Sequence, residues 1–246
     1  MRNAKFILSL IFILCSFIAS SQIIKDTITV LKTDRTKPAI YKAPNGKLYK
    51  VRFVSDPSAP FGTETLKCGE DTFSGKDRAI AKTSFVKGVP ATSFNSISQL
   101  IASLTPDAVI RPKLTTTSKR IADENKNVRL EKNIFLYAMK SESDNDYHII
   151  VGDNKTLSKA TLLNIEISGV PKTGNAAIQK VRDFFETNFV QLCGTKYAVF
   201  TGNPIPIKIS GSVFYDVDHP AGQVGPTGLR PKTSWEIHPI GEITMK

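Results

Sequence analysis

The three histidines of this chain are the residues best suited to chemistry, and acidic residues lie near each of them in the sequence. His148 follows an acidic loop, whereas His219 and His238 lie near the C-terminal end and are each followed by proline. Imidazoles and carboxylates together can bind a divalent transition metal, or a carboxylate can orient a histidine that acts as a general base. The candidate site residues are Asp146, His148, Asp216, His219, Arg230, Glu236 and His238.

A structural role is the main alternative for these histidines. The closely spaced zinc motifs H-E-x-x-H and C-x-x-C do not occur in the sequence. In the structural interpretation, each His-Pro pair fixes the end of a strand and the imidazoles bond neighbouring backbone or carboxylate groups. The sequence favours this interpretation. A metal site on His148, His219 and His238, and catalysis by a histidine, stay open as alternatives.

Other catalytic motifs are absent from the sequence. There is no G-x-S-x-G nucleophile elbow, and the glycines between Gly222 and Gly225 lack the strand-to-helix context of a phosphate loop. Aromatic residues that could stack on nucleic-acid bases fit a barrel interior equally well. These are Tyr137, Tyr147, Phe214 and Trp235. The sequence does not identify a cofactor, and a divalent metal stays open.

Alternating and periodic apolar residues predict the elements that must position these side chains. Strands are expected at Val128–Met139, Tyr147–Val151, Lys159–Ser168, Ile205–Tyr215 and Thr233–Ile243, with an amphipathic helix at Asn175–Phe189. Further upstream, strands are expected at Ile28–Leu31 and Leu48–Val54, and a short helix at Ser93–Leu104. The pattern predicts a mainly β protein with one or two helices. A five-stranded OB-like Greek-key barrel has its helix between the third and fourth strands, although a generic α+β sandwich would use the same elements.

Successive side chains point to opposite sides of a strand, so periodicity tells which candidate residues lie on the face opposite the apolar residues of their own strand. The residues that lie opposite the main apolar sets are His148, Asp216, Glu236 and His238. Whether they converge depends on the strand order, which stays open. In an OB barrel the loops Ser141–Asp146 and Val217–Lys232 would flank the ligand cleft. The first loop is acidic and the second carries basic residues, so salt bridges between them are also expected.

The N-terminal residues resemble a cleaved signal peptide. Arg2 and Lys5 precede an apolar run, Phe6–Ile18, and small residues offer a cleavage site between Ser21 and Gln22. The run is short for a bilayer core of about 30 Å. A lipid-modified Cys15 is the weaker alternative, because this cysteine lies inside the run. Export to the periplasm or the extracellular space is therefore expected.

Export changes the charge and the cysteine count of the mature chain. The full sequence has 33 basic and 22 acidic side chains, and removing Arg2 and Lys5 leaves 31 against 22, a net charge of +9. The excess suggests an anionic partner such as nucleic acid or an acidic glycan, although scattered basic residues more often form a solvated surface. Cys68 and Cys193 would remain, either as a disulfide or as two buried thiols.

Several stretches together resemble an uncharacterised family of bacterial exported proteins. They are Lys140–Val151, the helix end FFETNF, and the segments GSVFYDVDHP and WEIHP. Members of that family carry a DYH or DFH strand, a G-x-x-F-x-D-x-x-H strand and a C-terminal E-[IL]-H-P strand. The resemblance covers residues 68–243 and implies that the histidines, Asp216 and Glu236 occupy motif positions. It implies no role for them.

The sequence therefore predicts three parts: a signal peptide at residues 1–21, a β-prone extension with a short helix at 22–111, and an OB-like barrel at 112–246. The leading functional hypothesis is an exported, non-catalytic binding or interaction protein. Its ligand, either anionic or another exported protein, would bind between the two loops. The alternative is a metal-dependent hydrolase or nuclease that uses the histidines and carboxylates.

Overall fold

The computed structural model describes residues 38–56, 71–189, 192–200 and 202–246. The strands are β1 (Ala39–Lys42), β2 (Leu48–Val54), β3 (Ala91–Phe94), β4 (Asn127–Ser141), β5 (Tyr147–Gly152), β6 (Leu162–Ile167), β7 (Tyr197–Phe200), β8 (Ile205–Tyr215) and β9 (Trp235–Met245). The α-helices are α1 (Ala79–Lys82), α2 (Ile97–Ala102), α3 (Asp107–Ile110) and α4 (Ala176–Phe189). Short 3-10 turns lie at Arg111–Lys113, Ala122–Glu124 and Leu157–Lys159.

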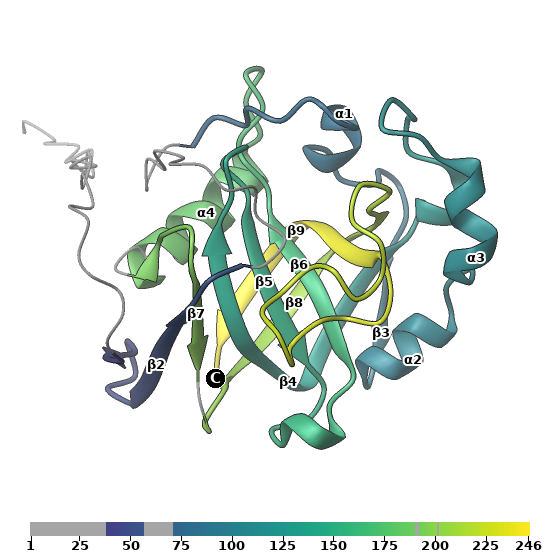
Figure 1. Ribbon diagram of the computed structural model, residues 1–246. Coiled ribbons are helices and arrows are strands. Elements are labelled where there is room, and N and C mark those ends of the chain that lie inside the picture. The colour runs from purple at the N-terminus through teal and green to yellow at the C-terminus, as the bar shows by residue number, and fades with distance from the viewer. Residues whose placement is uncertain (1–37, 57–70, 190–191, 201) are drawn as a thin grey trace, which may run out of the picture.

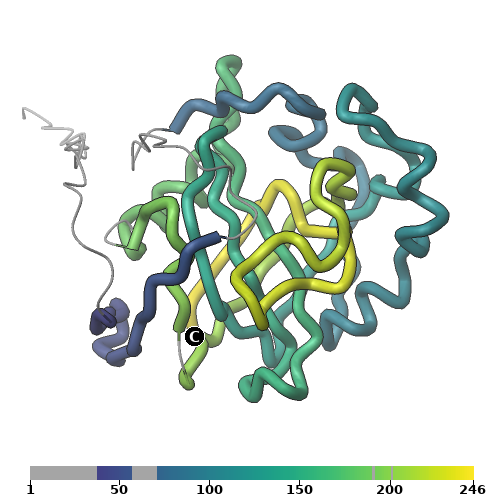
Figure 2. Tube along the Cα trace, viewed as in Figure 1, coloured from purple at the N-terminus to yellow at the C-terminus, as the bar shows by residue number. Residues whose placement is uncertain are grey.

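Five strands close into a mixed β-barrel (Figures 1 and 2). Around the ring, β4 pairs with β5, β5 with β6, β6 with β9, β9 with β8, and β8 again with β4. The β6–β9 pair is parallel and the other four are antiparallel. The remaining strands lie outside the ring. The prediction of a mainly β protein with a five-stranded barrel is confirmed.

The main hydrophobic core uses one face of each ring strand. Tyr147, Ile149 and Val151 of β5 lie in this core, whereas Ile150 belongs to a second, smaller apolar cluster. That cluster also contains Tyr137, Ala138, Tyr197, Val199 and Leu229. The alternation predicted for β5 is therefore present, and the face turned away from the main core is also covered. This second face carries the polar candidate residues.

Helix α4 forms as its sequence pattern predicts. Asn175 begins it, because its Oδ1 accepts hydrogen bonds from the backbone N–H groups of Ala177 and Ile178, at 3.2 and 3.3 Å. Its apolar side packs into the main core, where Phe185 lies 5.0 Å from Tyr147 between ring centroids. Figure 1 shows α4 on one side of the barrel, with α2 and α3 on the other.

The predicted helix at Ser93–Leu104 is wrong at its start. Residues Ala91–Phe94 form β3, which pairs in parallel with β4. The helix begins later, where the Ser96 side chain accepts a hydrogen bond from the Gln99 backbone N–H at 3.1 Å. Strand pairing with β4 competes successfully with the weak helical preference of this serine-rich stretch.

Besides β3, the outer strands β1 and β7 were not predicted, whereas β2 was. Leu48–Val54 is β2, as expected, and it pairs with β7, which in turn pairs with β4. The unpredicted strands β1 and β7 have only four residues each, too few to show alternation clearly. Tyr41 and Tyr49 nevertheless belong to the main core. The division of the chain at residue 111 stays a prediction.

Several predictions fall on residues outside the described ranges, namely the signal peptide at 1–21, the strand at Ile28–Leu31, and Cys68. Cys193 is fully buried and disulfide-bonded, and its Sγ lies 2.8 Å from Ser141 Oγ. Its pairing with Cys68 stays a prediction. Within the described ranges, no helix has both the length and the apolar character needed to cross a membrane.

Candidate functional site

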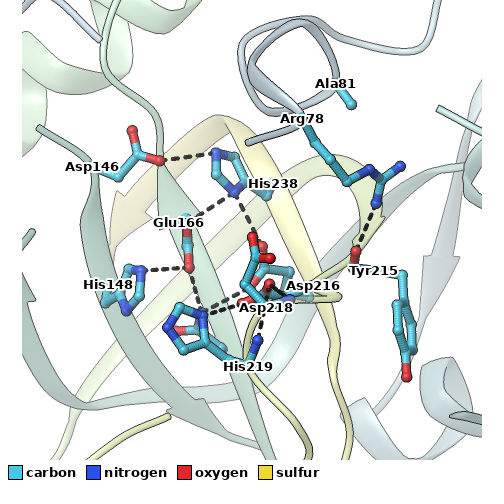
Figure 3. Close-up of polar contacts among 12 residues, drawn as sticks. Arg78, Ala81, Asp146, His148, Glu166, Tyr215, Asp216, Asp218, His219 and His238 are labelled. Atoms are coloured by element: carbon cyan, nitrogen blue, oxygen red, sulfur yellow. Dashed lines mark hydrogen bonds and ion pairs between the residues drawn. The ribbon is translucent and has the colours of Figure 1, made fainter. Parts of the chain in front are cut away.

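Polar residues from three neighbouring ring strands and two loops converge on the face of β5, β6 and β9 that is turned away from the main core (Figure 3). Together they form the histidine–carboxylate cluster. Its members are Glu142, Asp146, His148, Asn164, Glu166, Asp216, His219, Glu236 and His238. The three histidines predicted as candidates thus lie in one region of the molecule.

Glu166 is the centre of this cluster. Its Oε1 lies 2.7 Å from His148 Nε2, and its Oε2 lies 2.9 Å from His238 Nδ1. Strand register explains the first contact, because His148 and Glu166 face each other directly in the β5–β6 pair. One carboxylate therefore joins two of the predicted histidines, and the charge of these histidines holds the pKa of Glu166 well below its usual range in spite of its burial.

His148 is held between two carboxylates. Its Nδ1 lies 2.9 Å from Glu142 Oε1, opposite the contact with Glu166. Burial alone would lower the pKa of His148, but Glu142 and Glu166 outweigh it and raise that pKa well above the ordinary value. Because both ring nitrogens face carboxylate acceptors, the surroundings of His148 favour the imidazolium over the neutral ring.

His238 is completely buried among three carboxylates. Besides Glu166, its Nδ1 lies 3.1 Å from Glu236 Oε1, and its Nε2 lies 3.4 Å from Asp146 Oδ2. Burial opposes the charged form, but Glu166 and the hydrogen bonds to the carboxylates raise the pKa of His238 to about 10. The predicted role of His238-Pro239 in ending a strand is wrong. The pair lies inside β9, where the register with β8 shifts, and proline is tolerated at such irregularities.

Two of these carboxyl groups are held in environments that disfavour their charge. Burial, and then the charge of Asp144, raise the pKa of Asp146 to about 7. Burial, and then the charge of Glu166, raise the pKa of Glu236 to about 7. Asp146 Oδ1 accepts a hydrogen bond from the Gly169 N–H at 2.6 Å. Strongly shifted pKa values of this kind are typical of functional sites, although structural ion networks also produce them.

His219 and Asp216 form a separate pair at the edge of the cluster. His219 Nδ1 lies 2.6 Å from Asp216 Oδ2, while Asp216 Oδ1 accepts a hydrogen bond from the Asp218 N–H at 2.8 Å. The hydrogen bond that His219 Nδ1 donates to Asp216 raises the pKa of His219. Burial would raise the pKa of Asp216, but His219 outweighs it and lowers that pKa. The His219 side chain is 41% exposed, so this is the cluster histidine most open to a ligand.

A polar cleft of about 330 Å³ opens beside these histidines. Its lining includes Asp56, Asp77, Lys82, Lys140, Glu142, Asp144, His148, His219 and Val224. Residues of both predicted loops therefore face one cleft. Lys140 is neutralised by ion pairs with Asp56 and with Glu142, the latter at 2.6 Å. For Lys82, the surrounding carboxylates, Glu166 foremost, outweigh burial and raise its pKa.

Arg230 does not join this cluster. Its guanidinium donates to the Gly225 and Gly222 carbonyl oxygens, at 3.2 and 3.3 Å, inside its own loop. It therefore stabilises the loop and does not form the expected bridge to the acidic loop. The other six candidates, Asp146, His148, Asp216, His219, Glu236 and His238, all belong to the cluster.

Several residues of the site were not singled out from the sequence. Glu166 and Asn164 lie on β6 between core residues, and the Asn164 amide donates to Glu166 Oε1 and Glu236 Oε2 at 2.7 and 2.9 Å. The alternation of polar and apolar residues in this strand could have pointed to them. Nothing in the local sequence marks Lys82 or Lys140, because both reach the cleft through tertiary packing.

The arrangement offers two kinds of chemistry. The exposed His219, oriented by Asp216, suits proton transfer. One ligand atom from each of Asp146, Glu166 and His238 lies within 4.8 Å of the others, a grouping able to hold a metal ion. Comparisons with protein-family models, curated proteins and solved structures find no match to this chain.

Proposed function

We propose that the protein is an OB-like enzyme that hydrolyses a polar substrate in the cleft beside His219. The ring order of the barrel and the position of α4 between β6 and β8 support the OB assignment. The extra strand β7 between α4 and β8 departs from the simple pattern. OB folds bind ligands on the face of their second and third strands, between two flanking loops. The candidate site occupies the corresponding position on β5 and β6.

The Asp216–His219 pair is the observation that carries the proposed reaction. Asp216 holds His219 through Nδ1, which leaves Nε2 as the nitrogen able to exchange a proton with a ligand. Neutral His219 would take a proton from water as the water oxygen bonds to the electrophilic atom of the substrate. The same histidine then returns the proton to the leaving group as the scissile bond breaks.

The lining of the cleft supports a polar, charged substrate. Lys82 remains a cation, and its ammonium group can stabilise negative charge that develops on the substrate. The lining also contains several carboxylates, so the cleft carries charges of both signs although the whole sequence is basic. A substrate with both an anionic group and hydrogen-bonding groups fits this mixture better than a simple polyanion does.

A non-catalytic binding function for the same cleft is the second candidate. It is favoured by the position of the cleft, which is where OB folds bind ligands without chemistry. In either function, the expected signal peptide would place the protein outside the cytoplasm, and that localisation remains part of the proposal. The two functions differ in one respect, because only the enzyme needs the proton-transfer capacity of His219.

A substrate panel with matched variants separates these functions. Fluorogenic esters, phosphomonoesters, phosphodiesters and glycosides, together with DNA and RNA, are incubated with wild type, His219→Gln, Asp216→Asn and Gln223→Ala. Gln223 is exposed in the same loop and does not line the cleft, so its variant is the control. Loss of a general base should slow one substrate class by about 100-fold or more. Turnover that His219→Gln retains, or wild type that binds without turnover, would overturn the enzymatic proposal.

A further inference from the structure

Three buried ligand atoms behind the cleft wall lack hydrogen-bond partners among the described residues. They are Asp146 Oδ2, Glu166 Oε2 and His238 Nε2. The three residues are at most 2% exposed, and each contributes one ligand atom to a group within 4.8 Å. Leaving one buried polar atom unpaired costs about 1–3 kcal/mol, so three together call for an explanation.

The other polar atoms of the same side chains are held firmly. Asp146 Oδ1 accepts from the Gly169 N–H at 2.6 Å, and Glu166 Oε1 accepts from the Asn164 amide at 2.7 Å. His238 Nδ1 is hydrogen-bonded to Glu236 at 3.1 Å. Each side chain is thus oriented by a neighbour through one atom, while a second atom makes no hydrogen bond to the described residues. Ligands of protein metal sites are held in the same way.

The ion-pair contacts within the group do not satisfy these atoms. His238 Nε2 lies 3.4 Å from Asp146 Oδ2, and Glu166 Oε2 lies 2.9 Å from His238 Nδ1. Neither contact forms a hydrogen bond in the described structure, since Nε2, Oδ2 and Oε2 all remain without one. These three atoms therefore lie close to opposite charges without a directional hydrogen bond. A spherical cation does not need the hydrogen-bond geometry that is missing.

We propose that Asp146, Glu166 and His238 bind a divalent transition-metal ion, of which Zn²⁺ and Mn²⁺ are the best representatives. One imidazole nitrogen and two carboxylate oxygens suit these ions, and the ion would displace the proton of His238 Nε2 into solvent when it binds. Metal–ligand bonds of about 2.0–2.2 Å place neighbouring ligand atoms roughly 3–3.6 Å apart. The 3.4 Å separation of His238 Nε2 and Asp146 Oδ2 already fits, whereas Glu166, whose Oε2 now lies beside His238 Nδ1, would have to turn toward the ion to complete the set.

This ligand set differs from the set of three histidines that the sequence suggested. His148 has both nitrogens engaged by carboxylates, and His219 belongs to the pair with Asp216. The ion would lie behind the cleft, with Glu166 joining it to His148 on the cleft wall. The inference goes beyond the proposed function, because metal binding at this position does not require that His219 transfer protons.

Metal binding can be measured directly on the purified protein. The protein is freed of metal with EDTA and titrated with Zn²⁺, Mn²⁺, Mg²⁺ or Ca²⁺, with melting temperature, calorimetry and elemental analysis as readouts. One equivalent of Zn²⁺ or Mn²⁺ should bind and raise the melting temperature by several degrees, because the ion stabilises only the folded state. Mg²⁺ and Ca²⁺ should bind far more weakly. Wild type that binds neither Zn²⁺ nor Mn²⁺ would overturn the proposal.

Matched variants test the ligand set. Asp146→Asn keeps an oxygen for the Gly169 N–H and should weaken metal binding by at least about 100-fold. Glu142→Gln changes a nearby carboxylate outside the set and should bind like wild type, as should His219→Gln. Unchanged affinity in Asp146→Asn would overturn the set. If that variant does not fold, X-ray absorption of the wild-type zinc protein decides, since more than one imidazole or any sulfur ligand contradicts the assignment.

Discussion

Two of the buried charged clusters among the described residues differ in how completely their polar atoms are paired. The first joins Arg78, just before α1, to Glu124 in a 3-10 turn. The second is the histidine–carboxylate cluster around Glu166. Both remove charges from water, which is costly unless partners replace the lost solvation. The comparison shows which of them is built for stability.

In the Arg78–Glu124 cluster every polar atom has a partner. The guanidinium donates to both Glu124 oxygens, at 2.9 and 2.6 Å, and also to the backbone oxygens of Tyr215, Ser118 and Lys119. The two carboxylate oxygens also accept from the N–H groups of Tyr215 and Ile121, at 2.9 and 2.8 Å. These bonds fix Arg78 in the left-handed region, with φ of 48°, which is unfavourable for a residue other than glycine.

The histidine–carboxylate cluster has the opposite character. It contains more carboxylates than its histidines can neutralise, and several of its atoms lack hydrogen bonds in the described part of the chain. Glu236 and Asp146 have raised pKa values, which means that the folded state favours the neutral, protonated form of both carboxyl groups. Stability alone would not maintain such an arrangement. The difference supports a functional origin for this cluster and a structural one for Arg78–Glu124.

The largest effect is expected from Glu124→Gln. The amide replaces one of the two fully buried carboxylate oxygens by an NH₂ donor, so two of the four donors that now meet Glu124 lose their acceptor. Breaking a buried pair in this way should lower the free energy of unfolding by about 3–5 kcal/mol, as measured by urea denaturation. Glu131→Gln is the control, because the Arg129–Glu131 pair is about half exposed and should contribute less than about 1 kcal/mol. A loss below 1 kcal/mol in Glu124→Gln would contradict the structural role.

A smaller effect, with a distinct pH dependence, is expected from Glu236→Gln in EDTA. The pKa of Glu236 is raised in the folded state from 4.5 to about 7, so the folded protein binds this proton more tightly than the unfolded chain does. The associated stability is complete below about pH 4.5 and is lost as the pH rises through about 7. Glutamine stays neutral throughout. The variant should therefore gain stability relative to wild type between pH 5 and pH 8.

Urea denaturation at several pH values checks this prediction. Asp146 has a similarly raised pKa, so the variant should keep part of the wild-type pH dependence. If Glu236→Gln loses stability relative to wild type as the pH rises, the two buried clusters do not differ in the proposed way.

The sequence was informative where one long, strongly periodic strand or helix decides the outcome. The alternation in Tyr147–Val151 correctly predicted that His148 lies opposite the core residues of β5. The period of Asn175–Phe189 correctly predicted α4. Both patterns arise because a single element must bury one face, and such patterns are visible in a short window of sequence.

The cluster itself could not be predicted, because it depends on strand order and register. Glu166 meets His148 only through the pairing of β5 with β6, and Asn164 meets Glu236 only through the parallel pairing of β6 with β9. Arg78 and Glu124 are likewise far apart in the chain. A shift of one residue in either strand pair would turn these side chains to the other face. Local sequence carries no information on such registers.

The smallest effect on stability, and the most specific one, is expected from Asp216→Asn. Asp216 raises the pKa of His219, so its removal should lower that pKa toward about 6.5, the value of an unperturbed histidine. His148, whose charge lowers the pKa of His219, and Glu166, whose charge raises it, stay in place. NMR titration of the His219 ring proton measures the shift, with Gln223→Ala as the control.

The stability that the pair contributes is present at low pH and lost as the pH rises through the pKa of folded His219. It should be below about 1 kcal/mol because His219 is 41% exposed. An unchanged or higher pKa in Asp216→Asn would show that Asp216 does not orient and charge His219. A chemical role for the histidine–carboxylate cluster, in contrast to the stabilising role of Arg78–Glu124, would then be supported only by the proposed buried metal ligands.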